Sequence, residues 1–246
     1  MLPSSPFTLR AAPVNTGPSP QPDIAVMVLM NLRRGGLLWG WARFLWGRYT
    51  LFRMQGLRFA KVLGSGFEGG FGLKPSLTRQ GLFCVFQGEA AADAFLRSPW
   101  LQAAQPHLQE WCWLKLQPFS SRGSWSSEVI TCSVSEPDQG PVASLTRASI
   151  RLSRLRPFWR HAPPAEQALA GSQGCLLAVG LGEAPVVRQA TFSVWQSIDH
   201  MNAYARSGAH LQAIQTAYRQ QHFSESMFVR YSVLGQGGQW KGVSLG

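Results

Sequence analysis

The sequence predicts an α+β protein made of two similar halves, each a ferredoxin-like βαββαβ unit, which together form a pseudodimeric α+β barrel. Three observations support this prediction: the order of the expected elements, an internal similarity between the halves, and the composition. Apolar residues make up 45% of the 246 positions and charged residues 14%, so the chain has ample material for a buried core.

The first half is expected to span residues 24–128. Short runs rich in apolar and β-branched residues predict strands at 24–33, 61–64, 82–87 and 113–119. Apolar residues recur at helical spacing between Leu37 and Gln55, and a second helix is expected from Ala90 to Trp111. The resulting order of elements is that of a ferredoxin-like unit.

The second half is expected to repeat this order over residues 141–234. Strands are predicted at 144–152, 176–180, 190–195 and 227–234, with helices at 157–170 and 199–221. Residues 129–140 are interpreted as a linker. Residues 1–23, rich in Pro and Ser, and residues 235–246 are interpreted as flexible tails.

The two halves resemble each other in sequence. Leu82–Gln87 aligns with Thr191–Gln196, and the similarity continues along the following helix with a one-residue insertion. Ten of the 24 positions from Leu82 to Gln105 are identical in this alignment, where about one or two are expected by chance. Trp100 of the first half corresponds to His210 of the second half.

The charge balance and the cysteines exclude several classes of protein. The net charge of +11 favours anionic partners such as acidic proteins or lipid headgroups. No zinc finger, RNA-recognition signature or basic helix is present, so no nucleic-acid partner is expected. The four cysteines form no C-x-x-C pair and no secretory signal precedes them. A cytoplasmic location with reduced thiols is therefore expected.

The helix expected at Leu37–Gln55 has an unusual distribution of residues. Its apolar side chains go nearly all the way round, and Arg43, Arg48 and Arg53 step round the helix as well. Three roles stay open: a dimer interface, a helix that contacts a membrane with snorkelling arginines, or a wall of an apolar tunnel. No stretch of the sequence is long and apolar enough to span a bilayer, so any membrane contact is expected to be peripheral.

Few residues suggest chemistry by themselves. No G-x-S-x-G or other hydrolase signature occurs. His210 lies within a predicted helix beside the apolar stripe of Leu211, Ile214 and Tyr218. An imidazole there suits either an iron ligand or a core histidine bonded to a carbonyl group.

Several strings, in the right order, resemble the family of spheroidene monooxygenases, also called acyclic carotenoid 2-ketolases. The resemblance covers roughly residues 24–234, and a glycine-rich loop departs from the family pattern at Phe71–Ser76. The matching strings are Gly56–Gly66, Ser120–Ser126, Thr146–Arg151, Phe158–Arg160, Gly180–Pro185, Gln189–Trp195 and Ala209–Glu225.

This resemblance implies oxidation at C-2 of an acyclic, methoxylated carotenoid with dioxygen and reductant. It also implies haem as the cofactor, with His210 as its iron ligand. Arg147 and Arg151 would then pair with the haem propionates, because guanidinium groups bind carboxylates well. Trp159, Phe192 and Trp195 would line the substrate pocket, although all three also suit an ordinary core.

Two other functions fit the same residues. One is a haem-binding or haem-degrading α+β barrel protein, and the other is a non-catalytic module that binds a carotenoid or another lipid. A ferredoxin-type electron donor fits the basic surface, since ferredoxins are acidic. The sequence leaves a homo-oligomer open.

Overall fold

The structure is a computed structural model of the 246-residue chain. It describes residues 21–70, 74–159, 169, 171–184, 186–206, 216, 219 and 221–245, without the side chains of residues 44, 48 and 68. The fold is α+β, as the sequence predicts, and every strand pairing is antiparallel.

The first half follows the predicted order of strands and helices. Its first strand is an unbroken apolar run that is buried on both faces, as expected for a central strand covered on either side. The elements are β1 (Asp23–Leu32), α1 (Leu37–Leu51), β2 (Leu57–Gly66), β3 (Pro75–Gln87), α2 (Glu89–Leu96), α3 (Pro99–Gln102) and β4 (Leu108–Gly123).

The second half contributes five further strands and, among its helical segments, α5 (Ile198–Ala205). Ser197 caps this helix, because its side chain accepts a hydrogen bond from the backbone N–H of His200. The elements are β5 (Val142–Ile150), β6 (Cys175–Ala184), β7 (Arg188–Trp195), α5 (Ile198–Ala205), β8 (Phe223–Trp240) and β9 (Val243–Ser244).

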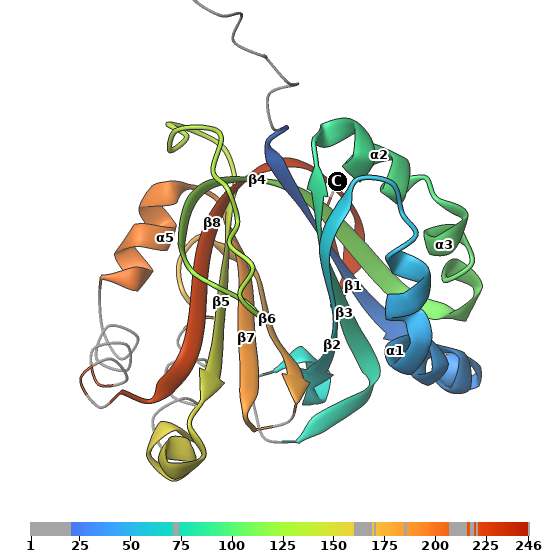
Figure 1. The fold of residues 1–246 in the computed structure, drawn as a ribbon, viewed down its shortest axis with the longest axis horizontal. Helices are drawn as coiled ribbons and strands as arrows, with labels where there is room; N and C mark the ends of the chain where they lie inside the picture. Colours follow the sequence, from blue (N-terminus) through green and yellow to red (C-terminus); the bar gives the residue numbers. More distant parts are fainter. Residues whose placement is uncertain are drawn as a thin grey trace, which may run out of the picture.

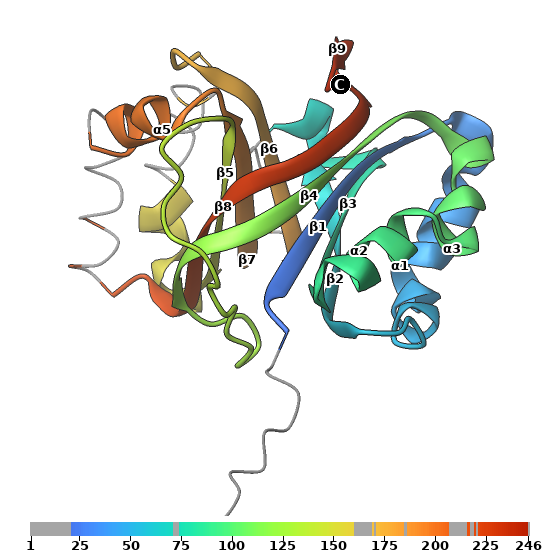
Figure 2. The ribbon, with the colours of Figure 1, turned by 90° about the horizontal axis from the view of Figure 1, so that it is seen from above.

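The strands form one closed sheet, in the order β4-β1-β3-β2-β6-β7-β5-β8-β9. A long pairing of β4 with β8 makes one seam, and a short pairing of β2 with β6 makes the other. At the short seam, Ser65 Oγ also donates a hydrogen bond to Gly180 O at 2.7 Å. Helices α1, α2 and α3 cover one flank of this barrel and α5 lies on the opposite flank (Figures 1 and 2).

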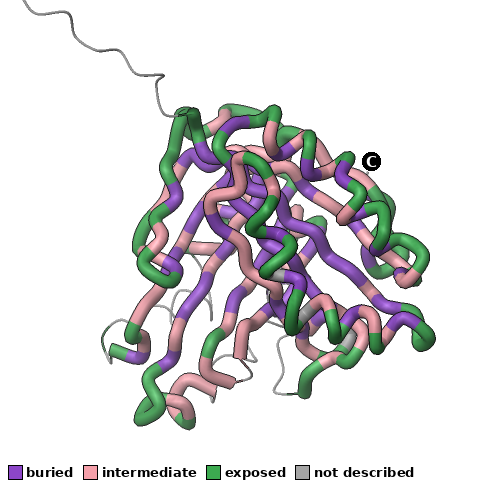
Figure 3. The backbone as a smooth tube through the Cα atoms, turned by 45° about the vertical axis from the view of Figure 1, so that its right-hand side comes forward, coloured by how far each residue is buried: buried purple, intermediate pink, exposed green. Residues whose placement is uncertain are grey.

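Side chains alternate along each strand between the barrel interior and the helix-facing side. The interior holds one large apolar cluster, in which the fully buried rings of Phe83 and Trp125 stack at 5.7 Å. Phe192, Val229 and Tyr231 belong to the same cluster. Burial follows the strands in the middle of the molecule, while exposed segments lie mainly in helices and loops (Figure 3).

Several expected boundaries differ from the structure, and two of these differences have a clear physical reason. The range expected as one helix, Ala90–Trp111, contains two short helices, a 3-10 turn and the start of β4. Pro99 is the first residue of α3, and Pro106 lies within the 3-10 turn, so neither continues the preceding helix. A tail was expected at residues 235–246, but residues 235–240 extend β8 to Trp240, which is 3% exposed. Gly238 permits this extension, because it has φ +90° and any Cβ there would overlap the carbonyl oxygen of Trp111.

None of the helices that the structure describes combines the length and the apolar character that a membrane crossing requires.

Candidate functional site

The helix-facing side of the sheet differs between the two halves. In the first half, β1 and β3 present four fully buried apolar side chains there, namely Val26, Val28, Leu82 and Cys84. The register of β5 and β7 places hydroxyl groups at the matching positions, namely Ser144, Thr146, Thr191 and Ser193. A hydrophobic layer in one half therefore corresponds to a polar surface in the other.

Part of this polar surface is internally bonded. The hydroxyl groups of Ser144 and Ser193 lie 3.0 Å apart, and the indole N–H of Trp195 donates to Ser193 Oγ at 3.0 Å. The ring of Trp195 lies 5.3 Å from that of Tyr204 on α5. Hydroxyl groups and an aromatic wall facing a helix layer suit the binding of an amphipathic ligand.

The interior of the barrel contains a cluster of charged residues at the short seam. Glu183 on β6 forms ion pairs with Lys61 Nζ at 2.8 Å and with Arg147 Nη2 at 3.2 Å. It also accepts a hydrogen bond from the indole N–H of Trp125 at 2.9 Å. Arg147 also pairs with Glu225 on β8. Since these residues come from both halves, the cluster joins the halves electrostatically.

The protonation states of the two acids follow from these contacts. Burial acts to raise the pKa of Glu183, but hydrogen bonds from Lys61 and Trp125 outweigh it and lower the pKa below its ordinary value. Burial likewise opposes ionisation of Glu225, while bonds from the Ser127 N–H and from Arg147 lower its pKa. Both acids are therefore carboxylates at neutral pH.

The structure separates the residues that the sequence suggested as a site. Arg147 and Phe192 point into the barrel interior, and both guanidinium arms of Arg147 already hold carboxylates. Trp195 faces the helix layer instead. Arg151 is exposed and donates from Nε to Phe223 O, and Trp159 donates to Val186 O at 3.0 Å.

The candidate iron ligand, His210, lies outside the described residues. Within the part of the chain that is described, no group of three His, Cys, Asp or Glu side chains is arranged to hold a metal ion. No single motif of the sequence indicates this polar surface. The self-alignment contains its signal, because Thr191-Phe192-Ser193 stands opposite Leu82-Phe83-Cys84.

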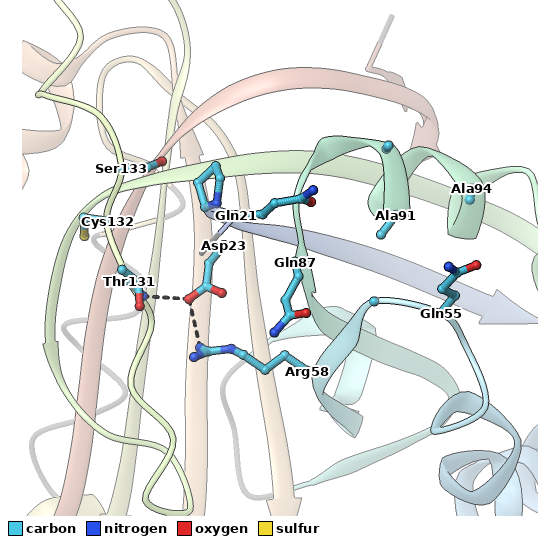
Figure 4. A pocket seen from close by; sticks show the side chains of 13 residues that line it. Gln21, Asp23, Gln55, Arg58, Gln87, Ala91, Ala94, Thr131, Cys132 and Ser133 are labelled. Atoms are coloured by element: carbon cyan, nitrogen blue, oxygen red, sulfur yellow. Dashed lines mark hydrogen bonds and ion pairs between the residues drawn. The ribbon is translucent and has the colours of Figure 1, made fainter. Parts of the chain in front are cut away.

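A separate pocket opens at the start of β1, with a volume of about 1070 Å³ (Figure 4). Asp23 accepts hydrogen bonds from Arg58 at 2.9 Å and from the Thr131 N–H at 2.7 Å on its wall. Gln21, Gln55, Gln87 and several alanines complete the lining. The pocket is open to solvent, and none of its lining residues is one that the sequence suggested as a site.

Comparison with known proteins adds independent information. No family model matches the chain. A spheroidene monooxygenase of Rubrivivax gelatinosus is 50% identical over 225 residues, which cover 91% of this chain and 87% of that protein. A spheroidene monooxygenase of Rhodobacter capsulatus is 33% identical over 211 residues, which cover 84% of this chain and 88% of that protein.

Solved structures resemble the fold at low sequence identity. An aldoxime dehydratase in complex with butyraldoxime has a TM-score of 0.55 at 10% identity, covering 86% of this chain and 79% of its own. A second aldoxime dehydratase has a TM-score of 0.51 at 11% identity, and the match covers 91% of this chain and 89% of that protein. These likenesses concern the fold alone. The sequence relatives decide the family: the chain belongs to the spheroidene monooxygenases.

Proposed function

We propose that this protein is an oxidoreductase that introduces a 2-keto group into an acyclic carotenoid. The observation that carries the proposal is the 50% identity, over 91% of the chain, to a spheroidene monooxygenase. The structure gives a second, weaker support, because the helix-facing side of the second half combines hydroxyl groups with the ring of Trp195, and such a mixture suits an amphipathic ligand.

The proposed reaction consists of two hydroxylations at one carbon. Each hydroxylation consumes one dioxygen, two electrons and two protons, converts C–H to C–OH and releases one water. The resulting gem-diol loses water to give the ketone. No side chain oxidises an unactivated C–H bond, so the proposal includes a cofactor, haem, whose bound iron supplies the activation of dioxygen.

The second half fits such a cofactor better than the first half does. Its helix-facing side carries hydroxyl groups and Trp195 instead of a closed apolar layer. We propose His210 as the imidazole ligand and Arg151, which is exposed, as one partner for a propionate. Arg147 is less suited to this task, because its guanidinium group is occupied by Glu183 and Glu225.

The two halves also support a proposal about the origin of the fold. In each half the strands follow the same spatial order: β4-β1-β3-β2 in the first and β8-β5-β7-β6 in the second. Together with the self-alignment, this order supports a tandem repeat of ferredoxin-like units that closes a pseudodimeric barrel.

The electron donor belongs to the proposal as well. The net charge of +11 supports an acidic partner, and a ferredoxin-type protein meets that requirement. A reductase chain with an acidic docking surface would meet it by the same electrostatics.

Co-expression with a pathway for acyclic carotenoids tests the proposed function. We expect new carotenoids with one carbonyl oxygen replacing two hydrogens at C-2, identified by mass and by a red-shifted absorption spectrum. The matched control is the His210→Ala variant expressed at the same level. Unchanged carotenoids with the wild-type protein, or bilin formation from added haem and reductant, would contradict the proposal.

A further inference from the structure

Lys115 on β4 and Arg230 on β8 occupy matching positions in the two halves. Lys115 lies opposite Val26 on β1, and Arg230 lies opposite Ser144 on β5. Both point to the helix-facing side, because the interior positions next to them on the same strands are apolar. Each half thus has one basic side chain under its helix layer.

The basic side chain of the first half is neutralised within the protein. Lys115 Nζ lies 2.6 Å from Glu89 Oε1 and 2.8 Å from Asp93 Oδ1, and both acids belong to α2. Burial acts to lower the pKa of Lys115, but the hydrogen bonds of these two carboxylates raise it above its ordinary value. The charge is therefore balanced without any ligand.

The second half lacks both acids. In the self-alignment Ile198 stands at the position of Glu89, and Asn202 stands at the position of Asp93. Asn202 Oδ1 is buried without a hydrogen-bond donor, and Arg230 Nε is buried without an acceptor. Two unsatisfied buried polar atoms at matching places indicate an absent partner.

The charges around Arg230 point to the sign of that partner. Arg122 is its diagonal neighbour on β4, since Ser120 pairs with Arg230 and Arg122 pairs with Phe228. Glu136, itself 56% exposed, approaches Arg230 no closer than 4.0 Å. Burial lowers the pKa of Arg230. The negative charge of Glu136 acts to raise this pKa, whereas the positive charges of Arg206 and Arg122 act to lower it further.

We propose that Arg230, with Arg122 beside it, binds a carboxylate group of the ligand held by the second half. A guanidinium group under a helix layer suits a carboxylate because it offers two parallel N–H donors. The identity of this ligand rests on the proposed function, under which the carboxylate is a haem propionate. The site itself rests only on the positions and contacts described above.

Porphyrin binding tests the proposal without requiring iron ligation or turnover. Titration of the purified protein with protoporphyrin IX, followed by fluorescence, should show binding to the wild type and at least about tenfold weaker binding to Arg230→Gln. The matched control Lys115→Gln should bind like the wild type. The dimethyl ester of protoporphyrin IX, which lacks free carboxylates, should bind equally well to Arg230→Gln and to the wild type.

A second variant guards against misfolding. Asn202→Asp restores the acid of the first half beside Arg230, so it should weaken protoporphyrin binding while keeping or raising the melting temperature. Equal binding of the free acid by the wild type and a folded Arg230→Gln would overturn the proposal, and so would no binding by the wild type. If protoporphyrin binds through Arg230 but haemin gives no Soret band, the anion site stands and the haem proposal fails.

A different feature, helix α1, carries a second inference. Its inner face combines Leu51, which is fully buried, with two glycines: any Cβ on Gly40 would overlap the side chain of Leu32, and Gly47 is buried. Its outer face carries large apolar side chains instead, with Leu38 at 87% exposure, Trp46 at 63% and Phe52, just after the helix, at 61%. The helix is therefore apolar on its outer face as well as on its inner face, unlike an ordinary surface helix.

The charges on helix α1 and in the segments that flank it in the sequence are all of one sign. No acidic residue occurs between Asp23 and Glu68, while Arg33, Arg34 and Arg53 are exposed at its two ends. Arg43 is held away from solvent, between the rings of Trp39 and Trp100 at 4.8 and 4.1 Å. An apolar face bordered by arginines is complementary to anionic headgroups above an acyl layer.

From this geometry we infer that the outer face of α1 docks on an anionic lipid bilayer. A second copy of the chain is a poorer occupant, because a two-fold contact would bring arginines against arginines without a compensating acid. The docking is independent of turnover and of any cofactor.

Vesicle flotation tests the docking. The wild type should bind vesicles of mixed phosphatidylglycerol and phosphatidylcholine, and Trp46→Gln should bind about tenfold more weakly. Arg34→Gln should bind the same vesicles about fivefold more weakly than the wild type. The matched controls are Leu77→Gln and Arg188→Gln, which change exposed residues elsewhere and should bind like the wild type.

Two results would overturn the inference about α1. The first is equal vesicle binding by wild type and a folded Trp46→Gln variant. The second is a dimer in solution that Trp46→Gln converts to a monomer, since the face would then join two copies of the chain.

Discussion

The helix-facing sides of the two halves have the same architecture but different chemistry. In the first half, β1 and β3 present valine, leucine and cysteine to α2, and Lys115 is paired with two acids of that helix. In the second half, β5 and β7 present serine and threonine, and the matching Arg230 has neither acid beside it. The comparison teaches that one copy completes its own core while the other leaves polar and charged groups for a ligand.

The largest predicted effect is a difference in stability between two substitutions at aligned positions of the two halves. Leu82→Ala removes a fully buried side chain from the first half, and we expect it to lower the free energy of unfolding by about 2–5 kcal/mol. Thr191→Ala changes the matching residue of the second half, and we expect a loss below about 1 kcal/mol. Urea unfolding of both variants measures the difference. Equal losses would mean that the second half also contains a closed core there.

A second prediction concerns the charged cluster that joins the halves. The pKa of Glu183 and that of Glu225 are lowered, so their contribution to stability is present at neutral pH and is lost as the pH falls through these values. Glu183→Gln should cost about 3 kcal/mol at pH 7, because it leaves Lys61 and Arg147 with less compensation.

Urea unfolding between roughly pH 3 and pH 7 measures this effect. The difference in stability between wild type and Glu183→Gln should shrink as the acid is protonated. The Glu136→Gln variant serves as a control, because Glu136 is exposed and its contact with Arg230 is long. A difference between wild type and Glu183→Gln that does not change with pH would contradict the assignment.

The smallest predicted effect is chemical labelling of thiols on the two helix-facing sides. Burial raises the pKa of the Cys84 thiol in the first half well above its ordinary range, whereas it raises that of the half-buried Cys175 to about 11. Iodoacetamide at pH 8 should therefore label exposed Cys132 first, Cys175 more slowly and Cys84 only after unfolding. Mass spectrometry of timed samples gives the order, and early labelling of Cys84 would contradict a closed first half.

Much of the fold could be predicted from the sequence, because strand composition and helical spacing are local signals. The order of elements in the first half and the α+β class were predicted, whereas most of the residues of the helices expected at 157–170 and 199–221 lie outside the described part of the chain. The extension of β8 to Trp240 could not be predicted, since it depends on a glycine accommodating Trp111 of a distant strand. The single helix expected at Ala90–Trp111 was wrong because Pro99 and Pro106 outweighed the apolar periodicity.

The site was less predictable than the fold. Arg147 looked suitable for an anionic ligand, but strand register places Glu183 and Glu225 beside it. Register also determines that Arg122 and Arg230 are neighbours, and no local pattern in the sequence reports it. The contrast between Cys84 and Ser193 was present in the self-alignment, yet its meaning depends on which side of the sheet each residue faces.

Hydrogen–deuterium exchange with and without haemin tests most directly whether the second half holds the ligand. The account predicts slower exchange on haemin binding in α5, β5 and β8, and unchanged exchange in α1 and α2. The Arg230→Gln variant should lose that protection at the same haemin concentration. Protection confined to α1 and α2, with α5 and β8 unchanged, would contradict the account.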